Sequence, residues 1–472
     1  PSSQNPLVDP ARAAGRRALG LAALAEQGYA SPDEIERARH EPLRGISRGR
    51  PFLAPHFTSR LLLRAEDERR PLAGTWRTSL DLALQGTLED EVRHTVAQLA
   101  DRGVKQAAAV VLDNRTGEIL AWVGSPDFWA DTAGQVDMVA SPRQPGSALK
   151  PFLYALAFDR GATAATVLAD IATTYQTGAG PYHPRNYDRH YHGPVRVREA
   201  LASSYNIPAV ELADRIGYST LLHGLHQAGF LSLQRPPEYY GLGLALGNGD
   251  VTLLELANGY RALVNGGVWT PTRWWLGEHA AEGHGTRVVS ARAAALTLDI
   301  LADADARIPG FGLRTPFDWP FRVAAKTGTS RHFTDNWAVA VTEGFTVAVW
   351  AGNFSGRPME GVSGITGAGP LLHRAVLVTA ARYAPGVLPE AIEVGLVPAT
   401  ICRVSGMLAS PECPSVTEYF VPGSLPEGAC DWHREGMVRL PTEFAEWRAT
   451  EAARPLGGWA AKRAGVSEIP EA

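Results

Sequence analysis

Short apolar runs typical of β-strands occur at two places in this chain, separated by a long region of helical periodicity. Residues 105–113 and 118–125 flank the polar turn Asn114-Arg115-Thr116-Gly117, which predicts a strand hairpin. Residues 336–342 and 345–353 predict a second strand pair around Glu343-Gly344.

The region between the strand pairs has apolar residues at helical spacing. This pattern predicts helices over residues 146–161, 197–205, 220–230 and 252–267, followed by an apolar strand that leads into Lys326. Because strands lie on both sides of the helical region, we expect an α+β fold. Its antiparallel sheet is built from both ends of the region and carries helices on its faces.

The two ends of the chain differ in texture from this central part. Residues 1 to about 70 are helical in pattern and polar, with a helix-capping sequence at Ser31-Pro32-Asp33-Glu34 and then a connector rich in Arg and Pro. From about Leu396 the sequence becomes rich in Pro and Gly and contains all the cysteines.

Composition narrows the class of protein. Of 472 residues, 45% are hydrophobic and 20% are charged, with a net charge of -4, which is typical of a chain with an ordinary globular core. The sequence has no run of like charges, which argues against a nucleic-acid partner. It also has no uninterrupted apolar stretch of about 18 residues. The first residues do not resemble a secretion signal, so we expect the chain to be cut from a longer protein.

Lysine is scarce. Lysine and arginine total 45, but the only lysines are Lys105, Lys150, Lys326 and Lys462. Lysine differs from arginine in that it can lose its proton when its surroundings lower its pKa. Each lysine is therefore a candidate for chemistry that arginine cannot perform.

Ser147 and Lys150 form the first candidate pair. On the predicted helix 146–161 they are three residues apart and share one face. A serine hydroxyl needs a neighbouring base to become a nucleophile, and a desolvated lysine can be that base. The alternative is a helix-capping serine followed by a solvated lysine, and the pair by itself does not decide between them.

The second lysine lies in Lys326-Thr327-Gly328-Thr329, at the end of the predicted strand. A strand with a cation, two hydroxyls and a glycine can pair with an extended peptide and hold the carboxylate of that peptide. Ser204 and Asn206, with Tyr205 between them, are a third candidate group that can complete a proton relay and fix a substrate backbone. Alone, this triplet is equally typical of a helix end turning into a loop.

Together the three groups follow the order S-x-x-K, S-x-N, K-T-G, which is the pattern of penicillin-interacting serine acyltransferases. Residues 106–125, 184–212, 241–267 and 326–353 resemble the transpeptidase domain of class A penicillin-binding proteins, most of all the 1C type. The resemblance covers about residues 72–395. Tyr205 departs from the family, which commonly has a small or aliphatic residue there, and we expect it to narrow the site or alter its response to inhibitors.

The resemblance implies the penicillin-binding and β-lactamase-like transpeptidase fold, with a five-stranded antiparallel sheet flanked by helices. It divides the chain into the C-terminal remnant of a glycosyltransferase domain (1–50), a linker (51–80), the transpeptidase domain (81–395) and a C-terminal extension (396–472). The acidic Glu-Asp-x-x-Phe-type motif of the glycosyltransferase is absent from the sequence, so we expect no glycan polymerase activity. The implied parent is bifunctional and anchored at the extracytoplasmic face of the bacterial inner membrane, where other cell-wall synthesis proteins are its partners.

The resemblance also implies roles for the site residues. Ser147 attacks a D-Ala-D-Ala stem peptide, Lys150 accepts its proton, Ser204 and Asn206 assist, and Lys326, Thr327, Gly328 and Thr329 bind the substrate. No cofactor is needed, and β-lactams are covalent inhibitors. A D,D-carboxypeptidase or a β-lactam sensor remains an alternative, whereas a serine β-lactamase lacks an identifiable deacylating base. The intact motifs disfavour a purely structural module.

The cysteines have the spacing C-x10-C-x16-C-x2-H, formed by Cys402, Cys413, Cys430 and His433. Three thiols and an imidazole suit a structural zinc, but in an oxidising compartment one disulfide with a leftover thiol is the simpler expectation, and we place it ahead.

Two further groups receive structural interpretations. The histidines His183, His190 and His192 are expected to be polar loop residues, and Trp274-Trp275 is expected to pack in the core.

Overall fold

The computed structural model describes residues 9–41, 52–71, 74–131, 133–178, 180–277 and 285–450. The chain divides into two compact units, Pro1–Leu53 and Ala54–Ala472. The first unit contains α1 (Pro10–Glu26) and α2 (Pro32–His40), and the predicted capping sequence is confirmed because Ser31 and Glu34 form a capping box at the start of α2.

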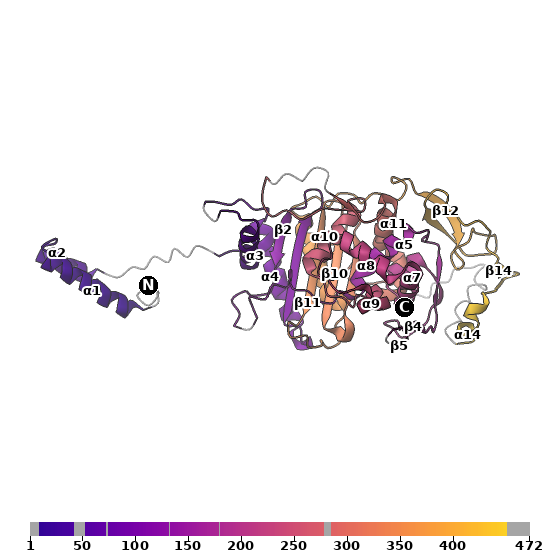
Figure 1. Cartoon of the computed structure of the whole chain (residues 1–472), viewed down its shortest axis with the longest axis horizontal. Helices are drawn as coiled ribbons and strands as arrows, with labels where there is room; N and C mark the ends of the chain where they lie inside the picture. Colours follow the sequence, from indigo (N-terminus) through magenta and orange to yellow (C-terminus); the bar gives the residue numbers. More distant parts are fainter. Residues whose placement is uncertain are drawn as a thin grey trace, which may run out of the picture. The chain divides into compact units, whose positions relative to one another are not determined.

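The second unit is built on a five-stranded antiparallel sheet with strand order β2-β1-β11-β10-β9. Its strands are β1 (Gln106–Asp113), β2 (Ile119–Val123), β9 (Ala324–Thr329), β10 (Asp335–Val341) and β11 (Phe345–Gly352). β1 pairs with β11 from Gln106 opposite Gly352 to Asp113 opposite Phe345. Figure 1 shows these early and late strands side by side. The expected sheet, assembled from both ends of the domain, is confirmed.

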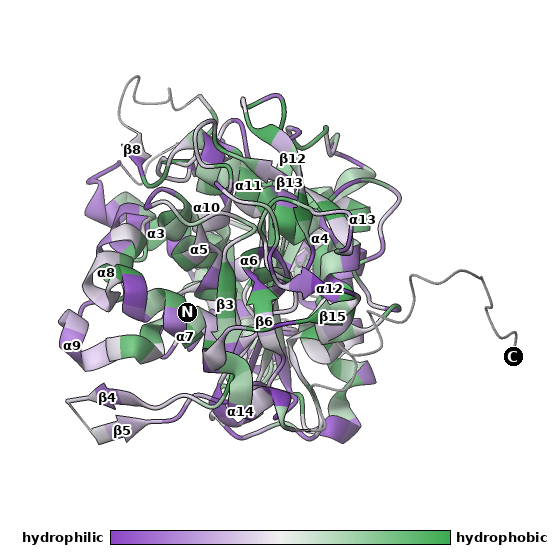
Figure 2. Ribbon diagram, turned by 90° about the vertical axis from the view of Figure 1, so that its right-hand side faces the viewer, coloured by the Kyte–Doolittle hydropathy of each residue, from purple (hydrophilic) through white to green (hydrophobic). Residues whose placement is uncertain are grey.

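Alternate residues of the central strands face two different cores. In β1, Ala108, Val110 and Leu112 belong to the larger core, whereas Ala109 and Val111 belong to the smaller one. The smaller core lies against α4 (Leu82–Gln98) and α13 (Gly369–Ala380). Both faces are therefore covered by helices, and apolar residues of these helices appear green in Figure 2.

The larger core is covered by most of the remaining helices. These are α3 (Pro55–Asp67), α5 (Lys150–Phe158), α6 (Val197–Ala202), α7 (Asn206–Ile216), α8 (Tyr218–Gln227), α9 (Pro237–Tyr240), α10 (Leu253–Val264), α11 (Ala291–Ala302) and α12 (Ala304–Phe311). Helix α3 lies inside the segment predicted as a linker, and Phe57 of α3 stacks on Trp274. Trp274 and Trp275 are buried, which confirms their predicted packing role.

Short antiparallel pairs complete the second unit. They are β3 (Val167–Asp170) with β6 (Gly193–Arg196), β4 (Tyr175–Thr177) with β5 (Gly180–Tyr182), β7 (Val268–Trp269) with β8 (Thr286–Arg287), β12 (Val397–Cys402) with β13 (Ser415–Phe420), and β14 (His433–Arg434) with β15 (Met437–Val438), followed by α14 (Ala445–Arg448).

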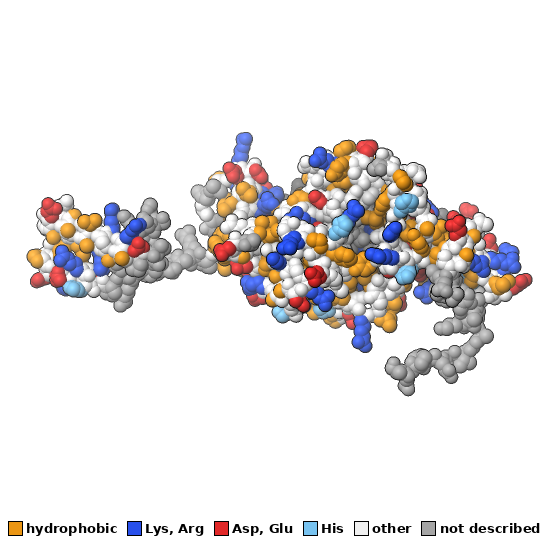
Figure 3. All heavy atoms as spheres, turned by 90° about the horizontal axis from the view of Figure 1, so that it is seen from below, with side chains coloured by type: hydrophobic (Ala, Val, Ile, Leu, Met, Phe, Trp, Pro, Cys, Tyr) orange, Lys and Arg blue, Asp and Glu red, His pale blue; other side chains and the backbone are white. Residues whose placement is uncertain are grey.

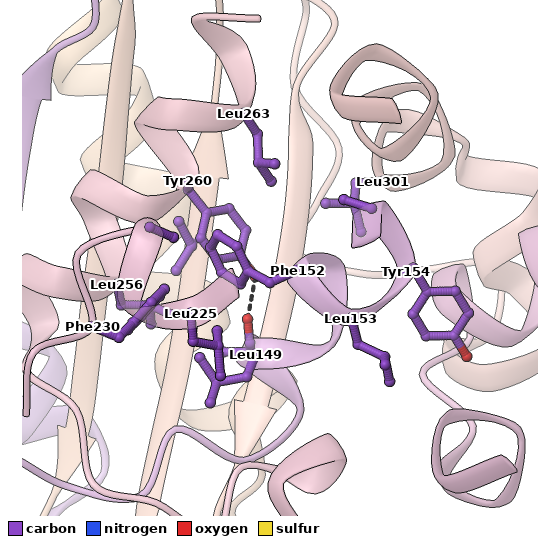
Figure 4. Close-up of a cluster of buried hydrophobic side chains, with 14 of the residues drawn as sticks. Leu149, Phe152, Leu153, Tyr154, Leu225, Phe230, Leu256, Tyr260, Leu263 and Leu301 are labelled. Atoms are coloured by element: carbon purple, nitrogen blue, oxygen red, sulfur yellow. Dashed lines mark hydrogen bonds between the residues drawn. The ribbon is translucent and has the colours of Figure 1, made fainter. Parts of the chain in front are cut away.

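Helix α5 runs through the larger core. All nine of its residues are buried, and its apolar side chains meet those of α8, α10 and α11. Phe152 makes edge contacts with Phe230 and Tyr260, and the Tyr260 hydroxyl donates a 2.7 Å hydrogen bond to the Ala148 carbonyl (Figure 4). The segment that carries Ser147 and Lys150 is thus fixed by packing on its inner side.

None of the helices in the described ranges combines the length and the apolar character needed to cross a membrane. On the face drawn in Figure 3, acidic and basic side chains are both scattered over the surface.

Replacing Leu153 by Ala tests how far α5 depends on this core. Leu153 is fully buried, so the Leu153→Ala variant should lose about 2–5 kcal/mol of unfolding free energy through lost contacts and a cavity. Leu231→Ala is the matched control, because Leu231 is 66% exposed and its loss should change stability by less than about 0.5 kcal/mol. Urea unfolding of both variants measures the difference, and equal losses would contradict the assignment of Leu153 to the core.

Candidate active site

The predicted site residues come from three separate elements. Ser147 lies in η3, a 3-10 turn at Gly146–Leu149, and Lys150 is the first residue of α5. Ser204 and Asn206 lie at the junction of α6 and α7. Lys326 to Thr329 lie in β9, the edge strand of the sheet. The described structure brings the three elements into contact.

The turn at Ser147 differs from the single helix expected over residues 146–161. The Ser147 carbonyl accepts a hydrogen bond from the backbone N–H of Lys150, three residues on. The next residue, Pro151, has no N–H with which to make the usual α-helical bond to that carbonyl. The first turn is therefore tightened to 3-10 geometry, and the α-helix begins only at Lys150.

Two glycines allow this turn to sit directly on β9. Gly146 has a φ of 56°, and a Cβ atom there would overlap the Thr329 carbonyl. A Cβ atom at Gly328 would overlap the Pro145 carbonyl and touch Ala148. Ser147 is consequently held beside the edge strand, half-buried, and its hydroxyl has no hydrogen-bond partner among the described residues.

Lys150 is fully buried, and its ammonium group is bound by the loop of the second motif. Its Nζ donates to the Ser204 carbonyl at 2.7 Å, the Tyr205 carbonyl at 2.9 Å and Asn206 Oδ1 at 2.7 Å. The backbone at Ser204 has a φ of 62°, a left-handed conformation that costs about 1 kcal/mol for a residue with a side chain. This conformation presents two successive carbonyls to one lysine.

Lys326 approaches the same loop from the sheet. Its Nζ donates to the Ser204 hydroxyl at 2.7 Å and to the Thr327 carbonyl at 2.9 Å. Ser204 thus contacts both lysines, Lys150 through its carbonyl and Lys326 through its hydroxyl.

The pKa values of both lysines are depressed. Burial lowers the pKa of Lys150 well below its ordinary value, the charge of Lys326 lowers it further, and Asp170 acts in the opposite direction. Burial, and then the charge of Arg307, lower the pKa of Lys326 to about 7. A neutral lysine at one of these positions is therefore accessible near neutral pH, which would not hold for arginine.

The hydroxyl of Thr329 remains able to bind a ligand. Its Oγ1 accepts a 2.9 Å hydrogen bond from the backbone N–H of Gly364, which leaves its own proton to donate. Thr327, two residues earlier in β9, is buried.

A layer of polar residues that the sequence analysis did not identify supports the second motif. Asn186 accepts hydrogen bonds from the backbone N–H groups of Asn206 and Ile207, and its amide donates to the buried carboxylate of Asp170. His192 lies 2.5 Å from the same carboxylate and stacks on the ring of Tyr205 at 4.0 Å.

This layer bears on two expectations. His192 is a polar residue of a loop, as expected, and it is held between Asp170 and Asp188. Burial alone would lower the pKa of His192, yet its hydrogen bonds and its attraction to these carboxylates raise it overall. Tyr205 was expected to narrow the site or alter its response to inhibitors, which stays a prediction, and its ring is buried against His192. In the sequence, only the closeness of Asn186 and His192 could have indicated this layer. Asp170 precedes both residues and lies on strand β3, so no local pattern connects it to them.

The four predicted metal-ligand candidates are also brought together. Cys402, Cys413, Cys430 and His433 are buried, and their ligand atoms lie within 4.8 Å of one another. The expectation that favoured a disulfide is not confirmed, because all three cysteines are free thiols.

Comparisons with known proteins decide the family. Residues 107–358 match the penicillin-binding protein transpeptidase domain, and the chain is 32% identical to penicillin-binding protein 1C of Escherichia coli (strain K12) over 394 residues, which is 83% of this chain and 48% of that protein. The chain belongs to the class A penicillin-binding proteins. Residues 393–435 match the C-terminal domain of penicillin-binding protein 1A.

Other penicillin-binding proteins are also similar to this chain in sequence or in fold. Penicillin-binding protein 1B of Vibrio cholerae is 30% identical over 387 residues, 78% of this chain and 49% of that protein. The chain therefore spans about half the length of these curated relatives. The crystal structure of penicillin-binding protein 1A from Haemophilus influenzae has the same fold, with a TM-score of 0.74 and 19% identity over 90% of this chain and 84% of that one. PonA1 from Mycobacterium tuberculosis, in complex with penicillin V, has a TM-score of 0.58 and 20% identity over 71% of this chain and 94% of that one.

Substituting Gly328 tests the close contact between the Ser147 turn and β9. In this penicillin-binding protein, Gly328→Ala should cost about 1–3 kcal/mol of unfolding free energy, because the added Cβ atom overlaps the Pro145 carbonyl. Gly86→Ala is the matched control: a Cβ atom in that helix meets nothing within 4 Å, and the substitution should be neutral or stabilise by up to about 1 kcal/mol. Denaturant unfolding measures both, and a neutral Gly328→Ala would show that the contact is not tight.

Proposed function

We propose that this chain is a serine D,D-transpeptidase, which cross-links peptidoglycan stem peptides and is acylated by β-lactams. The observation that carries the proposal is the pair of buried lysines joined by Ser204. Neither lysine has a salt bridge with a described residue, and two buried cations without counter-ions destabilise a fold. A purely structural role therefore does not account for the pair. A catalytic role needs both a lysine that can become neutral and a cation for a substrate carboxylate.

Binding of the donor peptide is assigned to β9. The extended D-Ala-D-Ala end of a stem peptide pairs along the backbone of this edge strand. Gly328 contributes by letting the Ser147 turn lie directly against the strand, beside the bound peptide. Lys326 and the Thr329 hydroxyl bind its terminal carboxylate, with Thr327 as part of the same strand surface. A bound carboxylate favours the ammonium form of Lys326 and offsets its low pKa of about 7.

Acylation begins with Ser147. Its oxygen attacks the penultimate carbonyl carbon, its proton passes to neutral Lys150, and the N–H groups of Ser147 and Thr329 stabilise the resulting oxyanion. An ammonium has three N–H groups, and Lys150 has three acceptors. A neutral amine donates only two, so deprotonation frees a lone pair that can take the proton of Ser147.

The leaving group then needs a proton. The Ser204 hydroxyl accepts a hydrogen bond from Lys326, so it gives its own proton to the nitrogen of the departing D-Ala and takes one from the Lys326 ammonium. Lys150, which contacts Ser204 through the carbonyl, keeps the proton of Ser147 and is held in position by Asn206. The C–N bond to D-Ala breaks and an ester of Ser147 remains. An amine from a second stem peptide resolves this ester to a cross-link, whereas water resolves it to a shortened peptide.

The remaining features of the parent protein stay predictions. We propose that the protein acts at the extracytoplasmic face of the bacterial inner membrane, where its substrate lies. The assignments of residues 1–50 to a glycosyltransferase remnant and of 51–80, 81–395 and 396–472 to the linker, transpeptidase domain and extension also stay predictions.

Intact mass after incubation with a panel of β-lactams tests the assigned nucleophile and base. The wild type should gain the mass of one inhibitor, and Ser147→Ala should gain none. Lys150→Arg should also gain none, because arginine keeps the charge but cannot accept the proton. Lys105→Arg, at an exposed lysine, is the matched control and should be acylated like the wild type.

Two results would contradict the proposal. An adduct that survives in Ser147→Ala excludes this nucleophile, and sustained hydrolysis of nitrocefin indicates a β-lactamase. Incubation with a pentapeptide stem donor and an amine acceptor then separates cross-linking from hydrolysis, since release of D-Ala without a cross-linked product indicates a D,D-carboxypeptidase.

A further inference from the structure

The C-terminal extension contains a buried cluster of three thiols and one imidazole. Cys402 ends β12, Cys413 precedes β13, and Cys430 lies just before His433 of β14. In the part of the chain that the structure describes, this is the one group of three or more such side chains with a metal-binding arrangement.

The geometry of the cluster suits a tetrahedral metal better than a disulfide. His433 Nδ1 lies 3.3 Å from Cys430 Sγ and 3.6 Å from Cys402 Sγ. A tetrahedral zinc with Zn–S of about 2.3 Å and Zn–N of about 2.1 Å separates such ligand atoms by about 3.6 Å. A disulfide instead requires two sulfurs at about 2.05 Å, and no cysteine pair is bonded.

Backbone amides are directed at two of the sulfurs. Cys402 Sγ accepts from the N–H groups of Val404 and Ser405, each at 3.4 Å, and Cys413 Sγ accepts from the N–H of Ser410 at 3.0 Å. Hydrogen bonds of this kind orient sulfur ligands and are common around metal sites. A divalent cation would balance most of the charge of three buried thiolates.

The local core is too small to hold these loops by itself. The buried residues of its apolar cluster are the three cysteines and Val404. Segments with so little apolar area to bury are usually held by a metal or a disulfide. We propose that Cys402, Cys413, Cys430 and His433 bind one structural Zn²⁺ that also holds the Ser204 loop in position.

The second half of this proposal rests on a buried ion network that joins the extension to the arm before the second motif. Glu418 of β13 is fully buried and accepts from Arg198 at 2.6 Å and from Arg196 at 3.2 Å. Arg196 Nε also donates to the carbonyl of Arg403, the residue after Cys402. Arg198 lies in α6, which ends two residues before Ser204.

Trp447 of α14 supports the same arm. Its ring covers Gly193 so closely that a Cβ atom there would overlap it, and its Nε1 donates to the Tyr191 carbonyl at 2.8 Å. Figure 2 shows α14 next to β3 and β6. The cluster therefore anchors the strands that carry Glu418, and Glu418 positions the arm that leads to Ser204.

Metal analysis of the whole chain tests the first half. Protein purified without a histidine tag should contain about one Zn²⁺ per chain, and Co²⁺ substitution should give a thiolate-to-metal absorption band. Cys413→Ser and Cys430→Ser should lose the metal. The exposed His223→Gln is the matched control and should retain it. A metal-free protein whose mass is 2 Da low, as expected for a disulfide, would overturn the site, and so would full zinc content in the cysteine variants.

Acylation of Ser147 by a β-lactam tests the second half, which rests on the proposed function. Removing Zn²⁺ with a chelator should lower the melting temperature and slow acylation about tenfold to a hundredfold, because Ser204 loses its position. Glu418→Gln should slow acylation to a similar extent while keeping the zinc. Unchanged acylation in the zinc-free protein would overturn the coupling. A zinc-loaded wild type that is never acylated would instead contradict the proposed function and leave the metal site standing.

Discussion

Two ammonium groups buried on either side of Ser204 are the constraint on which the active site depends. Lys150 donates to the Ser204 carbonyl and Lys326 to its hydroxyl, so one residue in a left-handed conformation holds both. Burial lowers the pKa of Lys150, and the nearby charge of Lys326 lowers it further. The carboxylate of Asp170 favours the charged form of Lys150, and it is held in place by Asn186 and His192.

The fold brings the two lysines together by packing three elements so closely that added side-chain atoms would clash. The buried helix α5 fixes Lys150, the edge strand β9 carries Lys326, and glycines at 146 and 328 allow the Ser147 turn to lie directly on that strand. Of the three elements, the loop that contains Ser204 depends most on contacts with residues distant in sequence. Its position depends on α6, and α6 is joined to the C-terminal extension through Arg198 and Glu418.

Local sequence signals predicted much of this arrangement. Periodicity predicted the strands of the sheet and several helices, among them α5, α8 and α10, whereas α4, α7, α11 and α13 were not predicted. The scarcity of lysine singled out Lys150 and Lys326, and the motif order indicated the family. Pro151 was a sequence signal for the 3-10 turn, because proline cannot donate the α-helical hydrogen bond to Ser147. The sequence analysis nevertheless predicted one continuous helix over residues 146–161. Pairings between distant residues had no local signal. Asp170 with His192, and Arg198 with Glu418 more than 200 residues away, follow only from the three-dimensional packing.

The depressed pKa values of the two lysines can be measured directly, because the chain has only four lysines. Protein labelled with ¹⁵N at lysine Nζ should give few resonances, and Lys150→Arg and Lys326→Arg assign the two of interest. A pH titration by NMR should show Lys326 losing its proton near pH 7 and Lys150 losing its proton well below the ordinary lysine value. If both instead titrate at about 10.4, the ordinary value, Lys150 is not available as a base and the account is contradicted.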